Sequence, residues 1–306
     1  MRTFIRLKQH NHSPQNNLMK KVLLAALVLA GFSANLSAQQ KAVEVSKVVN
    51  AEIEFDKLVE RKGIKAGFLA VADPEGIVFK PNMVKISEFY STIDKQPGKL
   101  TWKPKIARIS ANGDLAFTAG PYIYQNGKSD DDKVFGQYLS VWKLDNADNK
   151  LKLLIDLGIQ HPEPEGEAGT DFKEPDATKQ AAASKDPFKG KSVTLSNDNA
   201  FNKTLDASAL VGYKAFFAAE GTLYFPGFEP MTGKDKVSKF LTSEGMSITA
   251  QTVNAGRATS NDLAYSYGTA RIRKGNIVNN YNYVRIWEID ANRKWNILAE
   301  IFSTIE

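Results

Sequence analysis

The chain has 306 residues, 42% of them hydrophobic, and no cysteine, which excludes disulfides, thiolate nucleophiles and metal sites built on thiolates. Its net charge of +6 arises in the first 38 residues, which hold five of the 40 basic residues and none of the 34 acidic ones. The other 35 basic and 34 acidic residues leave a charge of +1, so we expect no nucleic-acid partner.

The first 38 residues have the layout of a secretory signal peptide. Lys20 and Lys21 precede an apolar run at 22–32, and Leu36-Ser37-Ala38 offers a small-residue cleavage site. The run is too short to span a bilayer as a helix, although a retained apolar anchor is the alternative interpretation. We therefore predict a leader over 1–38, export to the periplasm or the extracellular space, and no stable membrane insertion.

The residues after the leader predict helices first and strands afterwards. Val48, Phe55 and Val59 fall at helical spacing, Gly63 can end that helix, and a second short helix carries Phe68. Alternation and turn residues then predict strands at 76–79, 100–109, 114–124, 136–144 and 151–159. Helices followed by an antiparallel meander predict an α+β domain with its helices on one face of a curved sheet.

The second half of the chain repeats the first. The tetrapeptide at 114–117 recurs at 262–265, an offset of 148, and Trp142 recurs as Trp287, an offset of 145. Strands are accordingly predicted at 222–225, 247–258, 262–272, 281–289 and 295–302. A period this long indicates two domains rather than a solenoid. We place the first domain at 39–162, a charged and proline-containing linker at 163–190, and the second domain at 191–306.

Several motifs resemble an uncharacterised domain family of the nuclear transport factor 2-like superfamily, domain of unknown function 4440. They include Lys62-Gly63, Phe79-Lys80-Pro81, the run 100–104, Gly113-Asp114-Leu115 and Val141-Trp142. The resemblance covers residues 51–162, and the second copy is more divergent. It implies two cone-shaped domains, each with a pocket between sheet and helices, in a superfamily that contains both isomerases and non-catalytic binding modules. It also implies that the tandem chain is a monomer that forms an internal pseudo-dimer.

Aromatic and basic residues on neighbouring strands are candidate pocket residues. In the second copy, alternation places Tyr281, Tyr283, Arg285 and Trp287 on one face of a strand and Tyr265, Tyr267 and Arg271 on one face of its neighbour. These residues could together line an aromatic cavity, or they could form a solvated or domain-facing side of the sheet. The first copy has Phe117, Ala119, Ser140 and Trp142 at the matching places, a blander set that is typical of a core, and its candidate pocket residues are Trp102, Tyr138 and Trp142.

Asp156 and Glu300 are the candidate catalytic carboxylates, because each lies among apolar residues in the last strand of its copy. Burial in a pocket would raise the pKa of either group toward that of a general base. The alternative is an ion pair, for example between Glu300 and Arg285 or Arg271, which would depress the pKa. One histidine, His161, remains after the leader, and it fits a hydrogen-bonded strand end.

Two functions remain open at this stage. The first is an exported, non-enzymatic protein that binds a small organic ligand or a partner. The second is a cofactor-independent isomerase, dehydratase or cyclase that uses a pocket carboxylate for proton transfer. Neither function requires a metal or a cofactor, and we expect none.

Overall fold

The computed structural model describes residues 43–94, 96–180 and 187–305, with the side chains of 187–190 left out of the description. The leader predicted over 1–38 lies outside these residues. Within the described part of the chain, no helix is both long and apolar enough to cross a membrane. Residues 43–306 form one compact unit.

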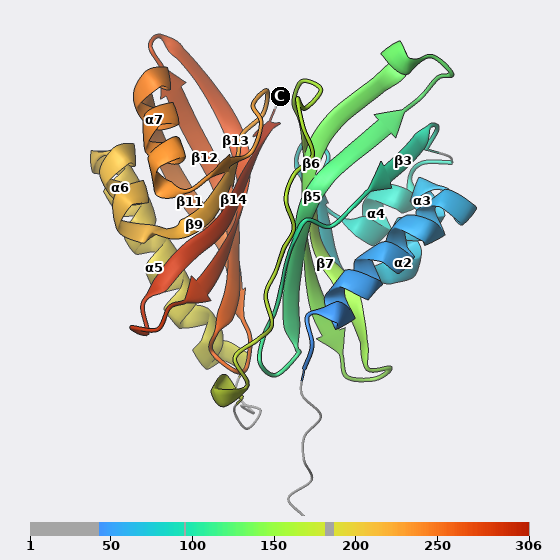
Figure 1. Cartoon of the computed structure of the whole chain (residues 1–306), viewed down its shortest axis with the longest axis horizontal. Coiled ribbons are helices and arrows are strands. Elements are labelled where there is room, and N and C mark those ends of the chain that lie inside the picture. Colours follow the sequence, from blue (N-terminus) through green and yellow to red (C-terminus); the bar gives the residue numbers. More distant parts are fainter. Residues whose placement is uncertain (1–42, 95, 181–186, 306) are drawn as a thin grey trace, which may run out of the picture. The chain divides into compact units, whose positions relative to one another are not determined.

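The first copy begins with two helices and then forms a mixed sheet (Figure 1). The elements are α2 (Ser46–Lys62), α3 (Ile64–Val71), β1 (Ala72–Phe79), β2 (Met83–Lys85), α4 (Ile86–Ser91), β3 (Lys99–Trp102), β4 (Ile106–Ile109), β5 (Leu115–Gln125), β6 (Lys133–Asp145) and β7 (Lys150–Gln160). A short 3-10 turn, η1 (Asp130–Asp132), joins β5 to β6. The strand order is β2-β1-β7-β6-β5-β4-β8, where β8 is the short strand Asp171–Phe172, with β3 also paired to β5.

The second copy repeats this plan with fewer strands. Its elements are α5 (Pro187–Ala207), α6 (Ala209–Phe216), β9 (Phe217–Tyr224), β10 (Met231–Thr232), α7 (Lys234–Glu244), β11 (Met246–Arg257), β12 (Leu263–Lys274), β13 (Ile277–Ile289) and β14 (Trp295–Ile305). The strand order is β10-β9-β14-β13-β12-β11. The α+β architecture predicted for both halves is confirmed.

Three details differ from the predicted pattern. The sheets are mixed rather than purely antiparallel, because β1 pairs with β7, and β9 with β14, in parallel. Helices α4 and α7 were not predicted from the sequence. The strand expected at 100–109 is interrupted after Trp102, because Pro104 has no amide hydrogen to donate to the ladder. Opposite the break, a Cβ on Gly120 would lie 2.1 Å from the carbonyl oxygen of Lys103, so only glycine fits there.

The segment expected as a linker is partly structured. Its residues 171–172 form β8 (Asp171–Phe172), which extends the first sheet by pairing in parallel with β4. Arg108 fixes this strand through an ion pair of 2.7 Å with Asp171. A short 3-10 turn, η2 (Ala177–Lys179), follows, and α5 begins four residues before the expected boundary at 191.

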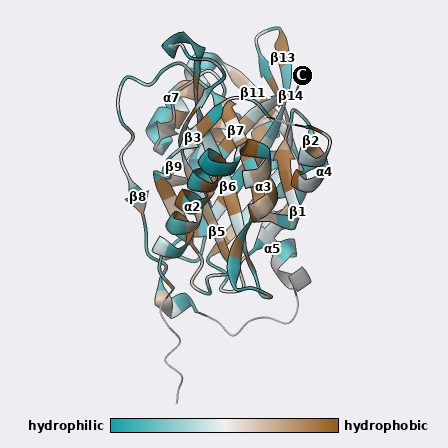
Figure 2. Ribbon diagram, turned by 90° about the vertical axis from the view of Figure 1, so that its right-hand side faces the viewer, coloured by the Kyte–Doolittle hydropathy of each residue, from teal (hydrophilic) through white to brown (hydrophobic). Residues whose placement is uncertain are grey.

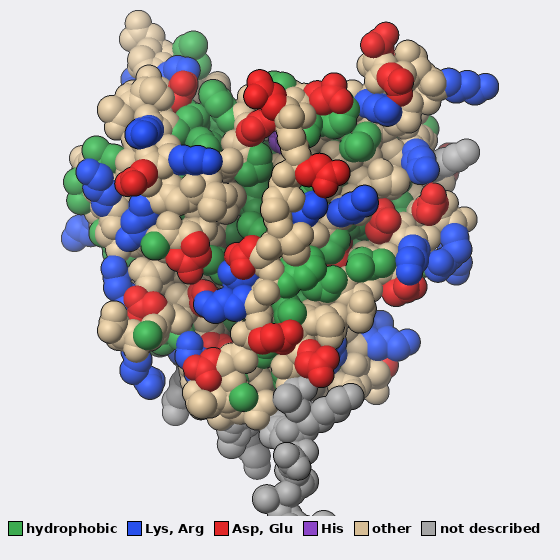
Figure 3. Space-filling model, viewed as in Figure 1, with side chains coloured by type: hydrophobic (Ala, Val, Ile, Leu, Met, Phe, Trp, Pro, Cys, Tyr) green, Lys and Arg blue, Asp and Glu red, His purple; other side chains and the backbone are tan. Residues whose placement is uncertain are grey.

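The core has three hydrophobic clusters, one under the helices of each copy and one between the two sheets. In Figure 2 the helices of the first copy lie in front of the hydrophobic strands that they cover. The faces of the two sheets that carry no helices pack against each other, with Phe79, Leu139 and Ile155 from one copy and Tyr224, Val284 and Ile301 from the other. On the face shown in Figure 3, acidic and basic side chains are interspersed.

Candidate functional site

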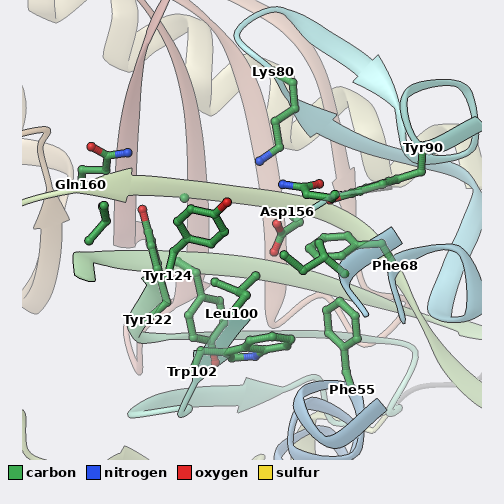
Figure 4. Close-up of a pocket in the computed structure, with 15 residues that line it drawn as sticks. Phe55, Phe68, Lys80, Tyr90, Leu100, Trp102, Tyr122, Tyr124, Asp156 and Gln160 are labelled. Carbon is green, nitrogen blue, oxygen red and sulfur yellow. The ribbon is translucent and has the colours of Figure 1, made fainter. Parts of the chain in front are cut away.

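A cavity of about 370 Å³ lies in the first copy, between its sheet and its helices. Phe55 of α2 and Phe68 of α3 meet edge to face with ring centroids 4.9 Å apart, and Phe68 stacks on Tyr90 of α4. The sheet contributes Trp102, Tyr122, Tyr124 and Tyr138. Seven aromatic side chains from six elements therefore surround one space, a composition typical of small-molecule sites (Figure 4).

Asp156 is the carboxylate of this cavity. It projects from β7 and accepts a hydrogen bond of 2.9 Å from the Ser140 hydroxyl, and Lys80 extends toward it from the chain after β1 (Figure 4). Burial raises the pKa of Asp156 to about 6, although Lys80 and Ser140 act in the opposite direction. The group can therefore exchange a proton near neutral pH.

The Tyr138 hydroxyl is a second polar group at the cavity. The side chain is only 6% exposed, and its hydroxyl oxygen has no hydrogen-bond partner among the described residues. Burial raises the pKa of this phenol well above its usual value, so it stays protonated and can donate. A buried hydroxyl that lacks a partner is costly.

Glu52 lies behind the cavity and positions one of its walls. This carboxylate is fully buried in α2 and accepts hydrogen bonds from the indole nitrogens of Trp102 (2.5 Å) and Trp142 (2.8 Å) and from the Thr118 hydroxyl. Burial raises its pKa to about 7, against the effect of these hydrogen bonds. Sequence reasoning missed Glu52, although a carboxylate three residues before Phe55 on an apolar helix face was a usable signal.

Glu52 and Asp156 lie at the two ends of a polar row that crosses the sheet. Thr118 of β5 pairs in register with Ser140 of β6, and Ser140 pairs with Asp156 of β7. Paired residues share a face of the sheet, so all three side chains point toward the helices. The row contains one fully buried acid, Glu52, one partly exposed acid, Asp156, and no cation.

The second copy has the same row with one decisive difference. Ser266 pairs with Arg285, and Arg285 pairs with Glu300, so Arg285 stands where the first copy has Ser140. The fully buried Arg285 binds Glu300 through Nε at 2.6 Å and Asp198 of α5 through Nη1 at 2.8 Å. Asp198 corresponds to Glu52, since each acid lies three residues before a buried phenylalanine of its helix.

The charges of this buried group are coupled. Burial raises the pKa of Glu300, although the Arg285 guanidinium and the Tyr213 hydroxyl favour its ionised form. Burial acts on Asp198 in the same sense, but the Arg285 guanidinium and hydrogen bonds from Thr252, Arg285 and Tyr283 outweigh it and lower the pKa. The ion pair with Arg285 that the sequence suggested as an alternative for Glu300 is therefore present. The pKa of Glu300 is nevertheless raised, not lowered as that alternative had implied.

The space that corresponds to the first cavity is filled in the second copy. Gly158 lies opposite Tyr138 in the first sheet, and Phe302 lies opposite Tyr283 in the second. Lys80 has its counterpart in Phe225, which contacts Phe302 with ring centroids 5.8 Å apart. Glu300, Tyr283 and Arg285 are fully buried, and they line neither the cavity of the first copy nor the three other main cavities among the described residues.

The predicted site residues therefore separate into three groups. Trp102, Tyr138 and Asp156 line the cavity, and Trp142 lies fully buried beside it. Tyr283, Arg285, Trp287 and Glu300 form the interior of the second copy. Tyr265, Tyr267 and Arg271 lie on the opposite face of the second sheet, where Tyr267 contacts Phe79 and Arg271 is exposed.

The aromatic cavity considered for the second copy does not form, and Tyr265 and Tyr267 take the alternative position on the face toward the other copy. Tyr267 pairs with Val284 and not with Tyr283 or Arg285, so the two predicted sets of side chains point to opposite sides of the sheet. Alternation along each strand was correct, but it does not reveal which residues of two strands lie opposite each other. The blander first copy holds the cavity.

His161 takes the structural role that its position indicated. It is buried at the end of β7, where Nδ1 donates to the Pro162 carbonyl oxygen at 2.6 Å and Nε2 lies 3.2 Å from the Gln137 amide. Among the described residues, no group of three or more histidine, aspartate or glutamate side chains is placed to hold a metal ion.

Comparisons with known proteins give structural neighbours but no family. No family model matches the chain, and no curated protein matches it. Among solved structures, a ketosteroid isomerase-like protein from Erwinia carotovora atroseptica is similar, with 16% identity over 36% of this chain and 92% of that one and a TM-score of 0.33. An epoxide hydrolase from Mycobacterium tuberculosis, described as LEH-like, has 12% identity over 38% of this chain and 80% of that one, with a TM-score of 0.31. A nuclear transport factor 2-like superfamily protein from Salmonella enterica has 12% identity over 38% of this chain and 90% of that one, with a TM-score of 0.32.

Proposed function

We propose that the first copy binds a small organic ligand in its cavity and that the second copy is a scaffold for the first. The observation that carries this proposal is the contrast between equivalent positions. Ser140 and Gly158 leave space in the first copy, whereas Arg285 and Phe302 fill that space in the second. The cavity is lined by aromatic rings, so a flat or partly apolar molecule fits its walls.

A direct test uses 2-naphthol as the probe and isothermal titration calorimetry as the measurement. Gly158→Phe places a ring where Phe302 lies in the second copy, and it should weaken binding at least about tenfold, or roughly 1.4 kcal/mol. Gly158→Ala is the matched control, since its Cβ would make only an ordinary contact of 3.4 Å with Tyr122. Binding that Gly158→Phe leaves unchanged, or no binding of 2-naphthol to the wild type, would contradict the proposal.

Proton transfer is a second candidate function, favoured by one specific observation. Asp156, with a pKa of about 6, and Tyr138, whose hydroxyl has no hydrogen-bond partner among the described residues, both line this cavity. Asp156 could remove a proton next to a ligand carbonyl while Tyr138 donates to the developing oxyanion. The test is deuterium exchange next to the carbonyl of 2-tetralone, followed by NMR in D₂O. Exchange equal in wild type and Asp156→Asn would exclude this function.

We also propose that the protein is exported and that each copy is a member of the domain family named above. The first 38 residues support export, and the motifs in 51–162 support the family. Purified from the envelope of a bacterial host, the protein should begin at Gln39. An intact residue Met1 or Met19 at its N-terminus would contradict export with cleavage.

A further inference from the structure

The second copy holds a buried guanidinium in an environment that resembles a ligand site. Arg285 is fully buried, and its carbon Cζ lies 3.8 Å from the centroid of the Tyr283 ring and 4.5 Å from that of Phe201. The same guanidinium forms an ion pair with Glu300 and donates to Asn202 at 2.6 Å. Aromatic faces and a carboxylate together stabilise a desolvated cation.

The first copy keeps these surroundings but not the cation. Tyr138 stands for Tyr283, Phe55 for Phe201 and Asp156 for Glu300, while Ser140 replaces Arg285. Tyr138, Phe55 and Asp156 all line the cavity. The guanidinium of the second copy thus indicates which chemical group the first cavity is shaped to receive.

The remaining walls strengthen this comparison. Where the second copy has Ala250 and Ala270 in β11 and β12, the first has Trp102 and Tyr122, which give the cavity two more aromatic faces. Asp156 has no ion-pair partner within 4 Å among the described residues, and Lys80, which is exposed, is the basic side chain that approaches it. A bound cation would compensate the buried carboxylate and interact with the ring faces.

We propose that the ligand of the first cavity is an organic cation, a guanidinium or alkylammonium group on a small apolar body, with Asp156 as its counter-ion. This inference rests on the proposed function, because it names the ligand class of the same cavity. Lys80 opposes such a ligand by charge repulsion and tunes the affinity. Glu52 lies behind Trp102 and is not its counter-ion.

The test compares three probes of similar size that differ in charge: benzylguanidinium, benzyl alcohol and phenylacetate. Titration calorimetry at pH 7.5 and low salt should show benzylguanidinium binding at least tenfold more tightly than benzyl alcohol. Phenylacetate should bind most weakly. Asp156→Asn should reduce the preference for benzylguanidinium over benzyl alcohol to less than threefold. Lys80→Met should increase that preference.

The possible outcomes separate this inference from the proposed function. If benzyl alcohol or phenylacetate binds as tightly as the cation and Gly158→Phe abolishes that binding, the cavity binds ligands but the cationic class is wrong. A cation preference that Asp156→Asn leaves intact also overturns the inference. If none of the three probes binds while 2-naphthol does, the ligand class is wrong and the proposed function stands. If 2-naphthol also fails to bind, both proposals fail.

Discussion

Ser140 and Arg285 occupy the same position in the two sheets, each paired in register with the acid of the last strand, Asp156 in one copy and Glu300 in the other. The two residues decide what each copy contains. Ser140 leaves the buried Glu52 and the partly exposed Asp156 without an ion-pair partner beside an open cavity, and Arg285 joins two buried acids and occupies the equivalent space. The two halves therefore differ at this position by a cation and the volume of its side chain, in addition to Phe302 and Phe225, which fill space in the second copy.

Ser140→Arg should make the first copy resemble the second. The new guanidinium would approach Asp156 and the ring of Tyr138, so it should lower the pKa of Asp156 and abolish 2-naphthol binding. The pKa is measured by NMR titration of the Asp156 carboxyl carbon, and binding by calorimetry. Ser140→Gln, which is long but uncharged, is the control and should hinder binding without lowering the pKa. A Ser140→Arg variant that binds 2-naphthol like the wild type would contradict the assigned equivalence.

Asp156→Asn and Glu300→Gln should have opposite effects on stability at pH 8. Glu300→Gln leaves the buried Arg285 with one carboxylate fewer and should destabilise the fold by about 2–4 kcal/mol. Asp156 has a pKa raised from 3.8 to about 6. The folded state thus holds this proton more tightly than the unfolded state, and stability falls as pH rises through that window. Removing the charge should therefore stabilise the fold at pH 8, by about 1 kcal/mol since the group is partly exposed.

Urea unfolding at pH 4 and pH 8 measures both effects. The gain from Asp156→Asn should be present at pH 8 and largely lost at pH 4, which lies close to the unfolded pKa of 3.8 and well below the folded pKa of about 6. If Asp156→Asn and Glu300→Gln destabilise the fold equally at pH 8, Asp156 must form an ion pair as Glu300 does. That result would contradict the proposed difference in charge between the two copies.

Glu52 should make the stability of the whole protein depend on pH. Its pKa is raised from 4.5 to about 7, so its contribution is fully present below about pH 4.5 and is lost as pH rises to about 7. Glu52→Gln keeps an acceptor for the two indole N–H groups and should flatten this loss, which we expect to be about 2–3 kcal/mol. Glu52→Ala removes the acceptor altogether and should destabilise at every pH, because both indoles lose their partner.

Equilibrium unfolding between pH 4 and pH 8.5 tests the role of Glu52, with tryptophan fluorescence as the signal. Asp198→Asn provides the comparison, because Asp198 has a lowered pKa and pairs with Arg285. The Asp198→Asn variant should be less stable than the wild type at neutral pH, whereas Glu52→Gln should be more stable than the wild type there. Parallel pH profiles for the wild type and Glu52→Gln would contradict the assigned pKa.

The packing of the two sheets should keep the copies together after the chain between them is cut. Asp114 of the first copy accepts hydrogen bonds from the backbone and hydroxyl of Thr259, and Asp262 of the second accepts one from the backbone of Ala111. Limited proteolysis should cut first within 163–190, in the exposed residues 165–170, and size-exclusion chromatography should then show both fragments in one peak.

Light scattering should give the mass of a monomer for the intact protein, since the apolar faces of both sheets already cover each other. Asp114→Ala with Asp262→Ala should weaken the association of the cut fragments by about 1–3 kcal/mol. Fragments that separate without these substitutions, or a stable dimer of the intact chain, would contradict an internal pseudo-dimer.

The sequence by itself determined the duplication and the fold class, because both depend on local information. Periodicity placed Val48, Phe55 and Val59 on one helix face, and turn residues separated the strands. It also identified Asp156 and Glu300 as unusual, since a carboxylate between apolar residues of a strand is costly wherever it lies. Short helices such as α4 left too weak a pattern to detect.

Only the tertiary structure decided which copy has a cavity. The strand register places Arg285 beside Glu300 and turns Tyr267 to the other side of the sheet, and register depends on contacts between segments far apart in the chain. The packing of α2 against the sheet brings Glu52 to Trp102 and Trp142, a contact across 50 and 90 residues that no local pattern contains. The sequence supplied equivalent acids to both halves, and the side chains that pack around each acid, Ser140 and Gly158 in one half and Arg285 and Phe302 in the other, left one half open and closed the other.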